Sequence, residues 1–357
     1  MNDSGFEDDF IAPDPPFTEE EQLSMKRDTR LSSLGEFGLI DRISSRVGVG
    51  GGVITGIGDD AAVTALTPGM QLLTSTDMLL EDVHFRRSWH PARLLGRKSL
   101  AVSISDVAAM GAIPRWALLS LGIPADLPLD FLDEFTEGFL SLAAEHGVTL
   151  IGGDTCSSRC GLVVSVAIMA EQYPDLIVRR SGAHGGHEIW VTGTLGDAAL
   201  ALKLLEGGHG ACEPSLCARL LDPTPRVAAG RALAESGLVS AMIDISDGLL
   251  ADFGHIAEMS GLGGELYLER MPTSGAFRRY AEQQPAFPYH LLLSGGEDYE
   301  LAFSAPPENR EKIYAAMEKS GIEATPVGIV TSFPGVRALL SDGSCHIPKK
   351  AGFTHFT

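Results

Sequence analysis

The sequence is poor in cysteine and has no long apolar run. It contains five cysteines in 357 residues, and no two of them have the C-x-x-C spacing that is typical of zinc sites and redox motifs. We therefore expect ordinary reduced thiols rather than a zinc centre. No apolar stretch is long enough to cross a membrane, and the acidic N-terminus is unlike the basic start of a signal peptide. These absences predict a cytoplasmic protein with no membrane partner.

Basic residues are also scarce. The chain has 27 Lys and Arg against 47 Asp and Glu, which gives a net charge of −20. A surface of this sign disfavours nucleic acid as a partner. Part of the excess lies in residues 1–25, which contain no Lys or Arg. Because residues 1–30 are rich in proline and acid, we expect them to form a disordered acidic tail.

Several sequence motifs of common enzyme classes are missing. No G-x-x-x-x-G-K-[ST] segment occurs, which excludes a P-loop. No G-x-S-x-G or H-E-x-x-H segment occurs, so nucleophilic hydrolysis has no support. The segment Gly56-Ile57-Gly58-Asp59-Asp60-Ala61 matches G-x-G-x-x-A, but its two acids would face a pyrophosphate, so dinucleotide binding is not expected.

Helices and strands are expected on both sides of a loop-rich stretch that begins at Tyr173. We place a domain boundary there, between an N-terminal domain of residues 31–172 and a C-terminal domain of residues 173–357. The first domain is expected to contain strands at 71–76, 116–122, 148–151 and 161–170 and helices near 34–43, 92–110 and 129–146. The second is expected to contain strands near 189–192, 241–245, 264–268 and 299–303 and helices from 197, near 227–235, from 249 and near 310–319. This mixture predicts two α+β or α/β domains.

Aspartates recur in one pattern, an apolar run followed by a polar turn. The five segments are Gly58-Asp59-Asp60, Ser75-Thr76-Asp77, Gly152-Gly153-Asp154-Thr155, Asp244-Ile245-Ser246-Asp247-Gly248 and Gly295-Gly296-Glu297-Asp298. Binding sites of open sheets assemble where strands end, and carboxylate oxygens suit Mg²⁺. Each segment alone is equally explained by a turn or, for Asp247 before a helix from Leu249, by a helix cap. Five of them together favour a metal site.

Asp106 interrupts an apolar helix. The surrounding segment, residues 100–110, is apolar enough to be largely buried, and an unpaired carboxylate there would be costly to desolvate. A cation would relieve this cost, and two kinds are possible. Arg97 or Lys98 would make the aspartate purely structural, whereas a metal ion would make it functional. Together with the other aspartates, we favour the metal.

The motifs resemble those of the thiamine-monophosphate kinase family over residues 31–357, and their conjunction is far more specific than any one of them. They are Gly35-Glu36-Phe37-x-Leu39-Ile40, Gly58-Asp59-Asp60-Ala61-Ala62, Thr76-Asp77-x-x-x-Glu81-x-Val83-His84-Phe85, Ser103-x-Ser105-Asp106-x-Ala108-Ala109-Met110-Gly111, Gly152-Gly153-Asp154-Thr155, Arg180-Ser181-Gly182-Ala183, Thr192-Gly193-Thr194-Leu195-Gly196-Asp197, Asp244-Ile245-Ser246-Asp247-Gly248 and Ser294-Gly295-Gly296-Glu297-Asp298-Tyr299-Glu300.

The resemblance implies a fold, an assembly and a set of site residues. It implies an α+β N-terminal domain whose sheet pairs across a homodimer, and an α/β C-terminal domain with a mixed sheet. ATP would lie between the domains, near the dimer interface. Contacts to several Mg²⁺ ions would come from Asp60, Ser75, Thr76, Asp77, Asp106, Asp154, Asp244 and Asp247, of which Asp77, Asp106, Asp154 and Asp244 would be catalytic. ATP would meet Thr136, Gly153, Asp154, Arg180 and Ser246, and thiamine monophosphate would meet His84, Glu297 and Phe353.

Three positions depart from the family pattern. Asp82 stands where the family usually has Gly, His187 follows Gly185-Gly186 where an Asp is usual, and Phe353 replaces a frequent Trp. None removes an expected metal ligand. The resemblance implies direct in-line transfer of the γ-phosphoryl group of ATP to thiamine monophosphate. The alternatives are another ATP-dependent synthetase of the same superfamily and a non-catalytic nucleotide-binding protein.

Overall fold

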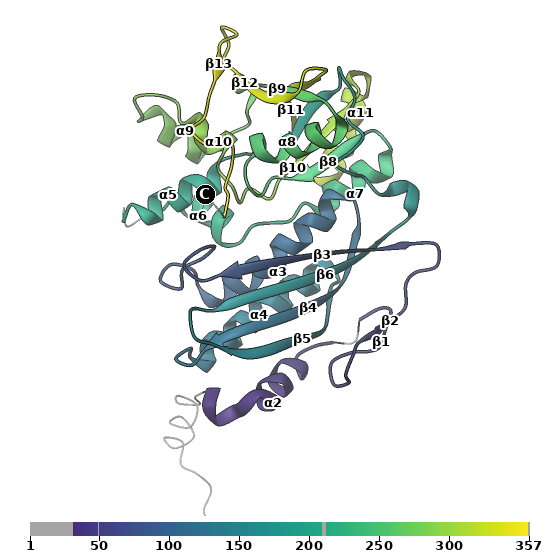
Figure 1. The fold of residues 1–357 in the computed structure, drawn as a ribbon, viewed down its shortest axis with the longest axis vertical. Coiled ribbons are helices and arrows are strands. Elements are labelled where there is room, and N and C mark those ends of the chain that lie inside the picture. The colour runs from purple at the N-terminus through teal and green to yellow at the C-terminus, as the bar shows by residue number, and fades with distance from the viewer. Residues whose placement is uncertain (1–30, 49, 209–211, 356–357) are drawn as a thin grey trace, which may run out of the picture.

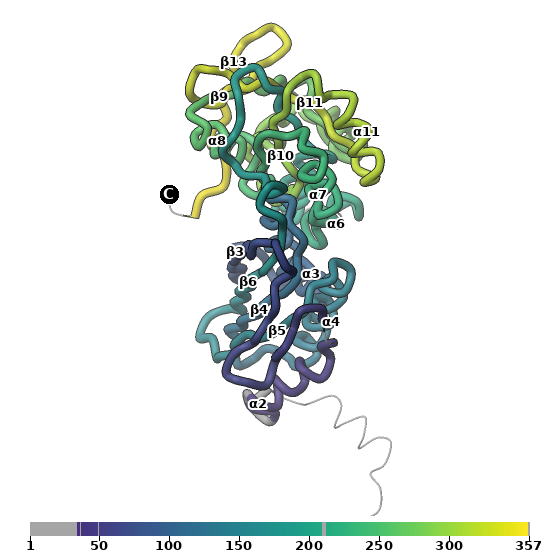
Figure 2. Tube along the Cα trace, turned by 90° about the vertical axis from the view of Figure 1, so that its right-hand side faces the viewer, coloured from purple at the N-terminus to yellow at the C-terminus, as the bar shows by residue number. Residues whose placement is uncertain are grey.

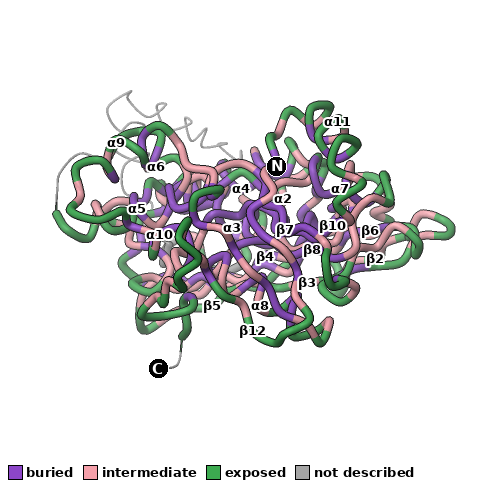
Figure 3. The backbone as a smooth tube through the Cα atoms, turned by 90° about the horizontal axis from the view of Figure 1, so that it is seen from above, coloured by how far each residue is buried: buried purple, intermediate pink, exposed green. Residues whose placement is uncertain are grey.

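The computed structural model describes residues 31–48, 50–208 and 212–355. The predicted acidic tail, residues 1–30, lies outside the described residues. The described chain forms two mixed domains stacked end to end, each built on one main sheet (Figures 1 and 2). Buried residues run through the interior of both domains, and the outer loops are exposed (Figure 3). None of the helices within these ranges is both long and apolar enough to cross a membrane.

The N-terminal domain is a four-stranded sheet covered by helices on one face. The strand order is β3 (Gln71–Leu80), β6 (Val163–Gln172), β4 (Ile113–Pro124) and β5 (Thr149–Ser158), antiparallel except for the β4–β5 pair. Helices α3 (Ala92–Ala109) and α4 (Leu129–His146) pack on the same face, behind the sheet in Figure 1. Alternate residues of β6, such as Val164, Val166 and Ile168, point into this core. Helix α2 (Leu31–Ser44) and the hairpin β1 (Val53–Thr55)–β2 (Val63–Thr64) lie on the β5 side.

The opposite face of this sheet has no helix over it in the described part of the chain (Figure 1). On β3, Leu72 and Met78 point to this face and are 49% and 55% exposed. Ser165, Ala167 and Met169 of β6 are only half-buried. Successive side chains of a strand point to opposite faces of the sheet. The apolar residues therefore point toward the helices, and the small or exposed residues between them point to the open face. An apolar sheet face that stays open is a common interaction surface.

The C-terminal domain contains a seven-stranded mixed sheet. Its order is β13 (Cys345–His346), β12 (Gly335–Leu339), β9 (Gly263–Tyr267), β11 (Ala324–Thr331), β7 (Glu188–Thr192), β10 (Leu301–Ala305) and β8 (Ala241–Asp244). Only β12 and β9 are parallel among these pairs of described strands. Helix α8 (Leu249–Ser260) packs on one face of the sheet. Helices α5 (Asp197–Glu206), α6 (Pro214–Leu221), α9 (Gly275–Glu282) and α10 (Tyr289–Leu293) extend the same apolar core. The other face packs against α7 (Val227–Ser236) and α11 (Arg310–Ser320).

Helix α3 joins the two domains. It belongs to the N-terminal core, yet it also contacts α6, α7 and β8 of the C-terminal domain. The approach to α7 is close, because a Cβ atom added at Gly230 would lie 2.0 Å from the carbonyl oxygen of Ala108. The helix that carries Asp106 is therefore clamped between both domains.

Most predicted elements are present, and two predicted strands are too short. The sequence pattern placed Asp77 and Asp154 just beyond strand ends, but β3 continues to Leu80 and β5 to Ser158. Both aspartates are therefore inside strands. The reason is pairing, since β6 and β4 extend far enough to keep hydrogen-bonding the polar residues. The strand-like segment expected between Gly52 and Gly58 is β1. The sequence analysis did not predict β2, α6, α9, α10 or β11–β13.

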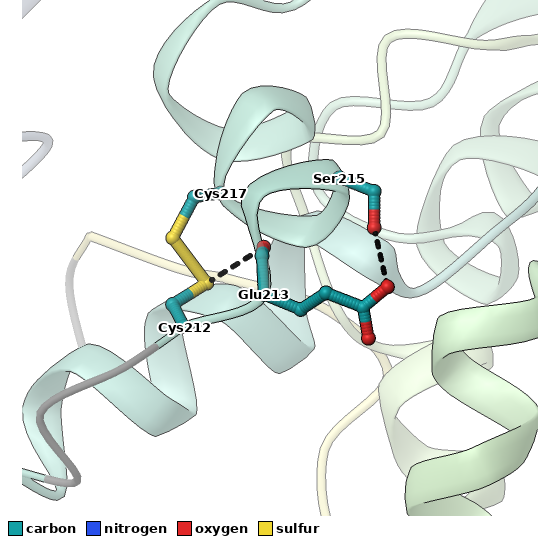
Figure 4. Close-up of a disulfide and its surroundings, with 4 residues drawn as sticks. All are labelled: Cys212, Glu213, Ser215 and Cys217. Atoms are coloured by element: carbon teal, nitrogen blue, oxygen red, sulfur yellow. Dashed lines mark hydrogen bonds between the residues drawn. A yellow bond between two sulfur atoms is a disulfide. The ribbon is translucent and has the colours of Figure 1, made fainter.

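The expectation of five reduced cysteines is wrong for one pair. Cys212 and Cys217 form a disulfide between the start of α6 and the segment before it (Figure 4). Their Cα atoms are 6.0 Å apart, within the normal range for a disulfide. The two cysteines are five positions apart and the chain between them enters α6, so their side chains can approach each other. Because this spacing is not C-x-x-C, a search for that motif does not find the pair. Cys156, Cys160 and Cys345 are free and exposed.

Candidate active site

Three aspartates from three elements converge where the two domains meet. Asp77 lies on β3, Asp106 on α3 and Asp244 at the end of β8. Each accepts a hydrogen bond from a serine hydroxyl: Ser103 Oγ donates to Asp77 Oδ2 over 2.7 Å and Ser105 Oγ to Asp244 Oδ2 over 2.7 Å, while Ser75 Oγ donates to Asp106 Oδ2. We call Asp77, Asp106 and Asp244 the acid cluster.

Burial and mutual repulsion make ionisation of the acid cluster unfavourable. Burial raises the pKa of Asp77 to about 6, and the charge of Asp106 adds to this. Burial raises the pKa of Asp244 to about 8, with further contributions from Asp106, Asp252 and Asp77. The pKa of Asp106 is raised by burial and partly restored by its bond with Ser75 and by the charge of Arg180. A bound cation would remove this penalty.

The two structural alternatives for Asp106 are not realised. Arg97 pairs with Asp222 over 2.8 Å and with Glu145 over 2.6 Å. Lys98 pairs with Glu297 over 2.8 Å. The cation whose charge reaches Asp106 is Arg180, one of the predicted nucleotide contacts. Asp106 is therefore not a partner in a simple buried salt bridge with either neighbouring basic residue.

The loop between β8 and α8 is capped by a residue that the sequence analysis did not single out. Asp252 Oδ2 accepts hydrogen bonds from the backbone N–H groups of Ser246, Asp247 and Gly248, over 3.0, 3.1 and 3.0 Å. Asp247 makes no side-chain cap at the start of α8, so the capping explanation of Asp247 is wrong. Asp252 holds the loop that leads into α8, and the Asp247 carboxylate is left facing a cavity.

A cavity of about 840 Å³ extends from Asp77 of the acid cluster toward the C-terminal segment. It brings together residues from both domains. Those predicted to bind metal, nucleotide or acceptor are Thr76, Asp77, His84, Ser246, Asp247, Glu297 and Phe353. Further lining residues of charged or aromatic type are Lys203, Glu206, Tyr299, Lys350 and His355. One chamber therefore connects the predicted phosphate chemistry with the predicted acceptor.

His84, Glu297 and Phe353 form one part of this cavity, which we call the acceptor wall. His84 Nδ1 accepts a hydrogen bond from the backbone N–H of Leu80 over 3.0 Å. The other ring nitrogen, Nε2, is then the protonated one when the ring is neutral. Burial lowers the pKa of His84, and the neighbouring His355 lowers it further. The rings of His84 and His355 are 5.1 Å apart, and Phe353 meets His355 edge-on at 4.8 Å.

The acceptor wall rests on unusual backbone conformations. Glu297 has φ 70° and Tyr299 φ 48°, in the left-handed region that side chains rarely adopt. Such residues cluster at binding sites, where the surrounding structure holds them. Here the backbone N–H of Glu297 donates to Ser246 O over 2.8 Å, and that of Tyr299 donates to Ile245 O over 2.8 Å. Asp82, near His84, also has a positive φ of 65°, which explains why glycine is usual at its position in the family.

Four predicted site residues lie away from the acid cluster in this chain. Gly153 and Asp154 are on β5, at the opposite edge of the sheet from Asp77 on β3. Asp154 is paired in register with Ser120, and its side chain points to the open face. Asp60 is exposed and lies in the segment between β1 and β2. Thr136 is 4% exposed on α4, a core position, so one chain gives no support for its predicted contact with ATP.

The described residues form no closed metal cage. Among the described residues, no three His, Cys, Asp or Glu side chains converge closely enough to hold one ion. The acid cluster and its hydroxyls still offer only hard oxygen donors, which suit Mg²⁺. This ion usually takes one or two carboxylates, keeps waters and shares substrate phosphates, so a preformed cage is not required.

Buried charges beneath the cavity were missed from the sequence. Glu300 is fully buried and accepts from Arg219 over 2.7 Å, from Arg226 and from the Thr192 hydroxyl over 2.7 Å. This network supports the loop that carries Glu297. Lys98 is a further buried charge, and it pairs with Glu297. Like Asp106, it is a charged residue in an apolar helix, and this signal indicates a buried charge that needs a partner.

The comparisons with known proteins agree with this geometry. Residues 58–171 match the AIR synthase related protein N-terminal domain, and residues 185–340 match the corresponding C-terminal domain. The chain is 37% identical to the thiamine-monophosphate kinase of Salmonella typhimurium over 90% of this chain and 98% of that protein. A crystal structure of thiamine-monophosphate kinase from Stenotrophomonas maltophilia is 38% identical, with a TM-score of 0.77 over 86% of this chain and 96% of that one. A structure of AaThiL complexed with AMPPCP and TMP is 33% identical, with a TM-score of 0.72 over 92% of this chain and 99% of that one. The chain therefore belongs to the thiamine-monophosphate kinase family.

Proposed function

We propose that the chain transfers the γ-phosphoryl group of ATP to the phosphate of thiamine monophosphate, giving thiamine diphosphate and ADP. The observation that carries the proposal is the cavity itself. It contains the Asp77 carboxylate, the Ser246–Asp247 loop and the whole acceptor wall. The structure of AaThiL, which matches this chain over 99% of its own length, was solved with AMPPCP and TMP. No sequence motif or described side chain calls for a covalent intermediate.

The transfer is in-line and balanced. An oxygen of the acceptor phosphate forms a bond to the γ-phosphorus while the bond from that phosphorus to the β–γ bridging oxygen breaks. The acceptor phosphate has a second pKa of about 6, as in phosphorylated residues, so it is largely ionised at neutral pH. No general base is needed to remove a proton. Since donor and acceptor are both anionic, offsetting charge is the main task of the site.

The acid cluster fits Mg²⁺ in its donor chemistry. We propose that Asp77, Asp106 and Asp244, with the Ser75 and Thr76 hydroxyls and Asp247, hold the ions. Mg²⁺ held by these oxygens would supply positive charge that offsets the negative charge developing on the phosphates. The chain's own contribution is to hold these oxygens on β3, α3 and β8, which are elements of both cores. Arg180 lies close enough to influence Asp106 and would contact a phosphate.

We further propose that a second copy of the chain covers the open sheet face and completes the site. Asp154 points to that face, three strands from the acid cluster. Exposed Leu72 and Met78 and half-buried Ala167 and Met169 supply an apolar surface for pairing. In a homodimer, Asp60 and Asp154 of one subunit would serve the acid cluster of the other. This arrangement supports their predicted metal contacts, which one chain cannot make.

A direct assay tests the activity. The purified chain is incubated with ATP, Mg²⁺ and thiamine monophosphate, and thiamine diphosphate is separated and quantified. We expect equal amounts of thiamine diphosphate and ADP, and no product with EDTA. ADP release with a different acceptor only would indicate another synthetase of the superfamily. Stable ATP binding without turnover on any acceptor would indicate a nucleotide-binding protein.

A mixing experiment tests the shared site. Asp106→Asn and Asp154→Asn chains are each expected to be nearly inactive. After denaturation and refolding together, mixed dimers would contain one site with both defects and one site with neither. We expect activity to return to roughly a quarter of the wild-type value if half of the dimers are mixed. No recovery, with mixed dimers confirmed by differently tagged chains, would contradict the shared site.

A further inference from the structure

Lys98 is a buried charge that the proposed chemistry does not use. It lies on α3 and is 1% exposed, whereas a lysine is almost never fully buried without a partner. Its ammonium group donates to the carbonyl oxygen of Leu220 over 3.0 Å. It also forms an ion pair of 2.8 Å with Oε1 of Glu297. Lys98 itself does not line the cavity, but Glu297 does.

The contact crosses from one domain to the other. Lys98 belongs to the N-terminal core, whereas Leu220 ends α6 and Glu297 lies on the loop before β10. Two neighbouring contacts strengthen the same seam. Buried His90, whose pKa burial lowers to about 3, donates Nε2–H to Leu221 O over 3.0 Å, and Arg97 pairs with Asp222 over 2.8 Å. All three contacts stabilise the C-terminal end of α6, where the last carbonyls have no helical partners. Only Lys98 also reaches the acceptor wall.

The ion pair fixes a side chain that would otherwise be free to turn. The Glu297 carboxylate is 22% exposed at the cavity wall, and its backbone is pinned in a left-handed conformation by Ser246. Lys98 binds Oε1, which leaves Oε2 for a ligand. A carboxylate held in one orientation before binding spends less conformational entropy on the ligand. Both charges also act on His84, since Glu297 raises the pKa of His84 and Lys98 lowers it.

We propose that Lys98 is a positioning residue for the acceptor: it orients Glu297 toward the cationic heterocycle of thiamine monophosphate and thereby sets acceptor affinity. The inference rests on the proposed function, because it takes thiamine monophosphate as the acceptor. The inference also assigns Lys98 to one part of the site, the acceptor wall. Lys98 acts on the acceptor wall through Glu297, and within the described part of the chain its ammonium group bonds to Leu220 and Glu297 rather than to the acid cluster.

The test is a double-mutant cycle with a structural control. Wild type, Lys98→Met, Glu297→Gln and the double variant are compared in KM for thiamine monophosphate, KM for ATP and kcat. We expect Lys98→Met to raise KM for thiamine monophosphate about tenfold, the size of an immobilised side chain plus a lost charge-held contact, with KM for ATP changed less than about threefold. In the Glu297→Gln background, Lys98→Met should raise this KM little further, because the carboxylate through which Lys98 acts is already absent. Lys98→Arg should recover part of the affinity.

His90→Gln is the control for a merely structural role. It weakens the same seam at Leu221 but does not touch Glu297. We expect a lower melting temperature with an unchanged KM for thiamine monophosphate. If His90→Gln raises that KM as Lys98→Met does, or if the Lys98 and Glu297 effects are additive, the inference is wrong.

Calorimetry with thiamine monophosphate alone separates this inference from the proposed function. Binding to wild type without turnover would reject the kinase reaction, and the dissociation constants of the four variants would still decide the role of Lys98. Absence of binding to correctly folded wild type would reject both. Melting curves of each variant, including the double variant in which no buried charge is left unpaired, show that the chains compared are folded.

Discussion

Asp77 of the acid cluster lines the same cavity as the acceptor wall, but the two regions are built differently. The acid cluster lies on two strands and a helix that belong to the domain cores, and each carboxylate is fixed by a serine hydroxyl. The acceptor wall lies on a turn, a strained loop and the C-terminal segment. Phe353 is 47% exposed, and its segment is attached through bonds such as Phe353 N–H to Asp247 O over 3.1 Å.

On the proposed function, the rigid region would carry out the phosphoryl transfer and the loop region would select the acceptor. Groups that must offset charge in a transition state gain from rigid placement. Groups that recognise one acceptor can lie on loops, which tolerate change without loss of the fold. We therefore expect substitutions in the acid cluster to lower the rate, and substitutions in the acceptor wall to lower acceptor affinity.

The largest effect is expected in the acid cluster. Asp77→Asn and Asp106→Asn remove a charge while keeping size and hydrogen bonding. We expect kcat to fall by about 10³-fold, the scale of losing a group that stabilises transition-state charge. Because the carboxylates repel one another, the melting temperature without Mg²⁺ should stay equal or rise. Product formation and calorimetric melting check the two statements, and unchanged kcat in both variants would contradict the metal assignment.

The loop under both regions gives the next effect. Asp252→Ala leaves the N–H groups of Ser246, Asp247 and Gly248 without their acceptor, and we expect a loss of ~2 kcal/mol in the free energy of unfolding. Asp247→Ala is the matched control, since Asp247 does not cap the helix, and its stability should change by less than ~0.5 kcal/mol. Urea unfolding measures both, and equal losses would contradict the assignment of Asp252 as the cap.

The aromatic part of the acceptor wall should affect affinity only. Phe353→Ala removes the ring face that we predict to stack on the cationic heterocycle, and we expect KM for thiamine monophosphate to rise about tenfold with kcat nearly constant. Phe353→Trp restores the ring that is frequent in the family and should lower this KM a few-fold. Steady-state kinetics at saturating ATP provides the comparison. A large fall in kcat for the alanine variant would place Phe353 in the chemistry instead.

The smallest effect is a pH dependence of stability without metal. The pKa values of Asp77 and Asp244 are raised in the folded state, to about 6 and about 8. Between pH ~4, the unfolded value, and these values, the folded chain binds more protons than the unfolded chain. This contribution is present in full at low pH and is lost as pH rises through 6 and 8. The melting temperature in EDTA should therefore fall by a few degrees toward pH 8, and Mg²⁺ should reverse the fall most strongly there.

Asp244→Asn provides the control for this pH effect. Removing one titrating carboxylate should flatten the dependence between pH 6 and 8. Scanning calorimetry from pH 5 to 8.5 with and without Mg²⁺ would show it. An equally steep curve in the variant would assign the pH dependence to other groups.

The sequence predicts the rigid parts of this molecule better than its loops. Helices α3 and α4 are both found where the sequence predicts them, and Asp106 is conspicuous because it interrupts an apolar run. Strand ends are predicted poorly, because continuation of β3 past Asp77 depends on its partner β6, which lies far away in the sequence. Lys98 pairs with Glu297 across 199 positions, as the difference of their numbers shows, and no local pattern indicates such a contact. The aspartates of the acid cluster can therefore be picked out from the sequence. The contact between Lys98 and Glu297, which supports the acceptor wall, is seen only in the folded structure.

The most direct test of this account is single-turnover phosphoryl transfer at increasing thiamine monophosphate concentration for wild type, Asp106→Asn and Glu297→Gln, with enzyme in excess over ATP. At saturating acceptor, we expect Glu297→Gln to reach a rate close to that of wild type and Asp106→Asn to remain about 10³-fold slower. The opposite result, a Glu297→Gln rate that stays low at saturation while Asp106→Asn reaches the wild-type rate, would contradict the separation of chemistry from acceptor selection.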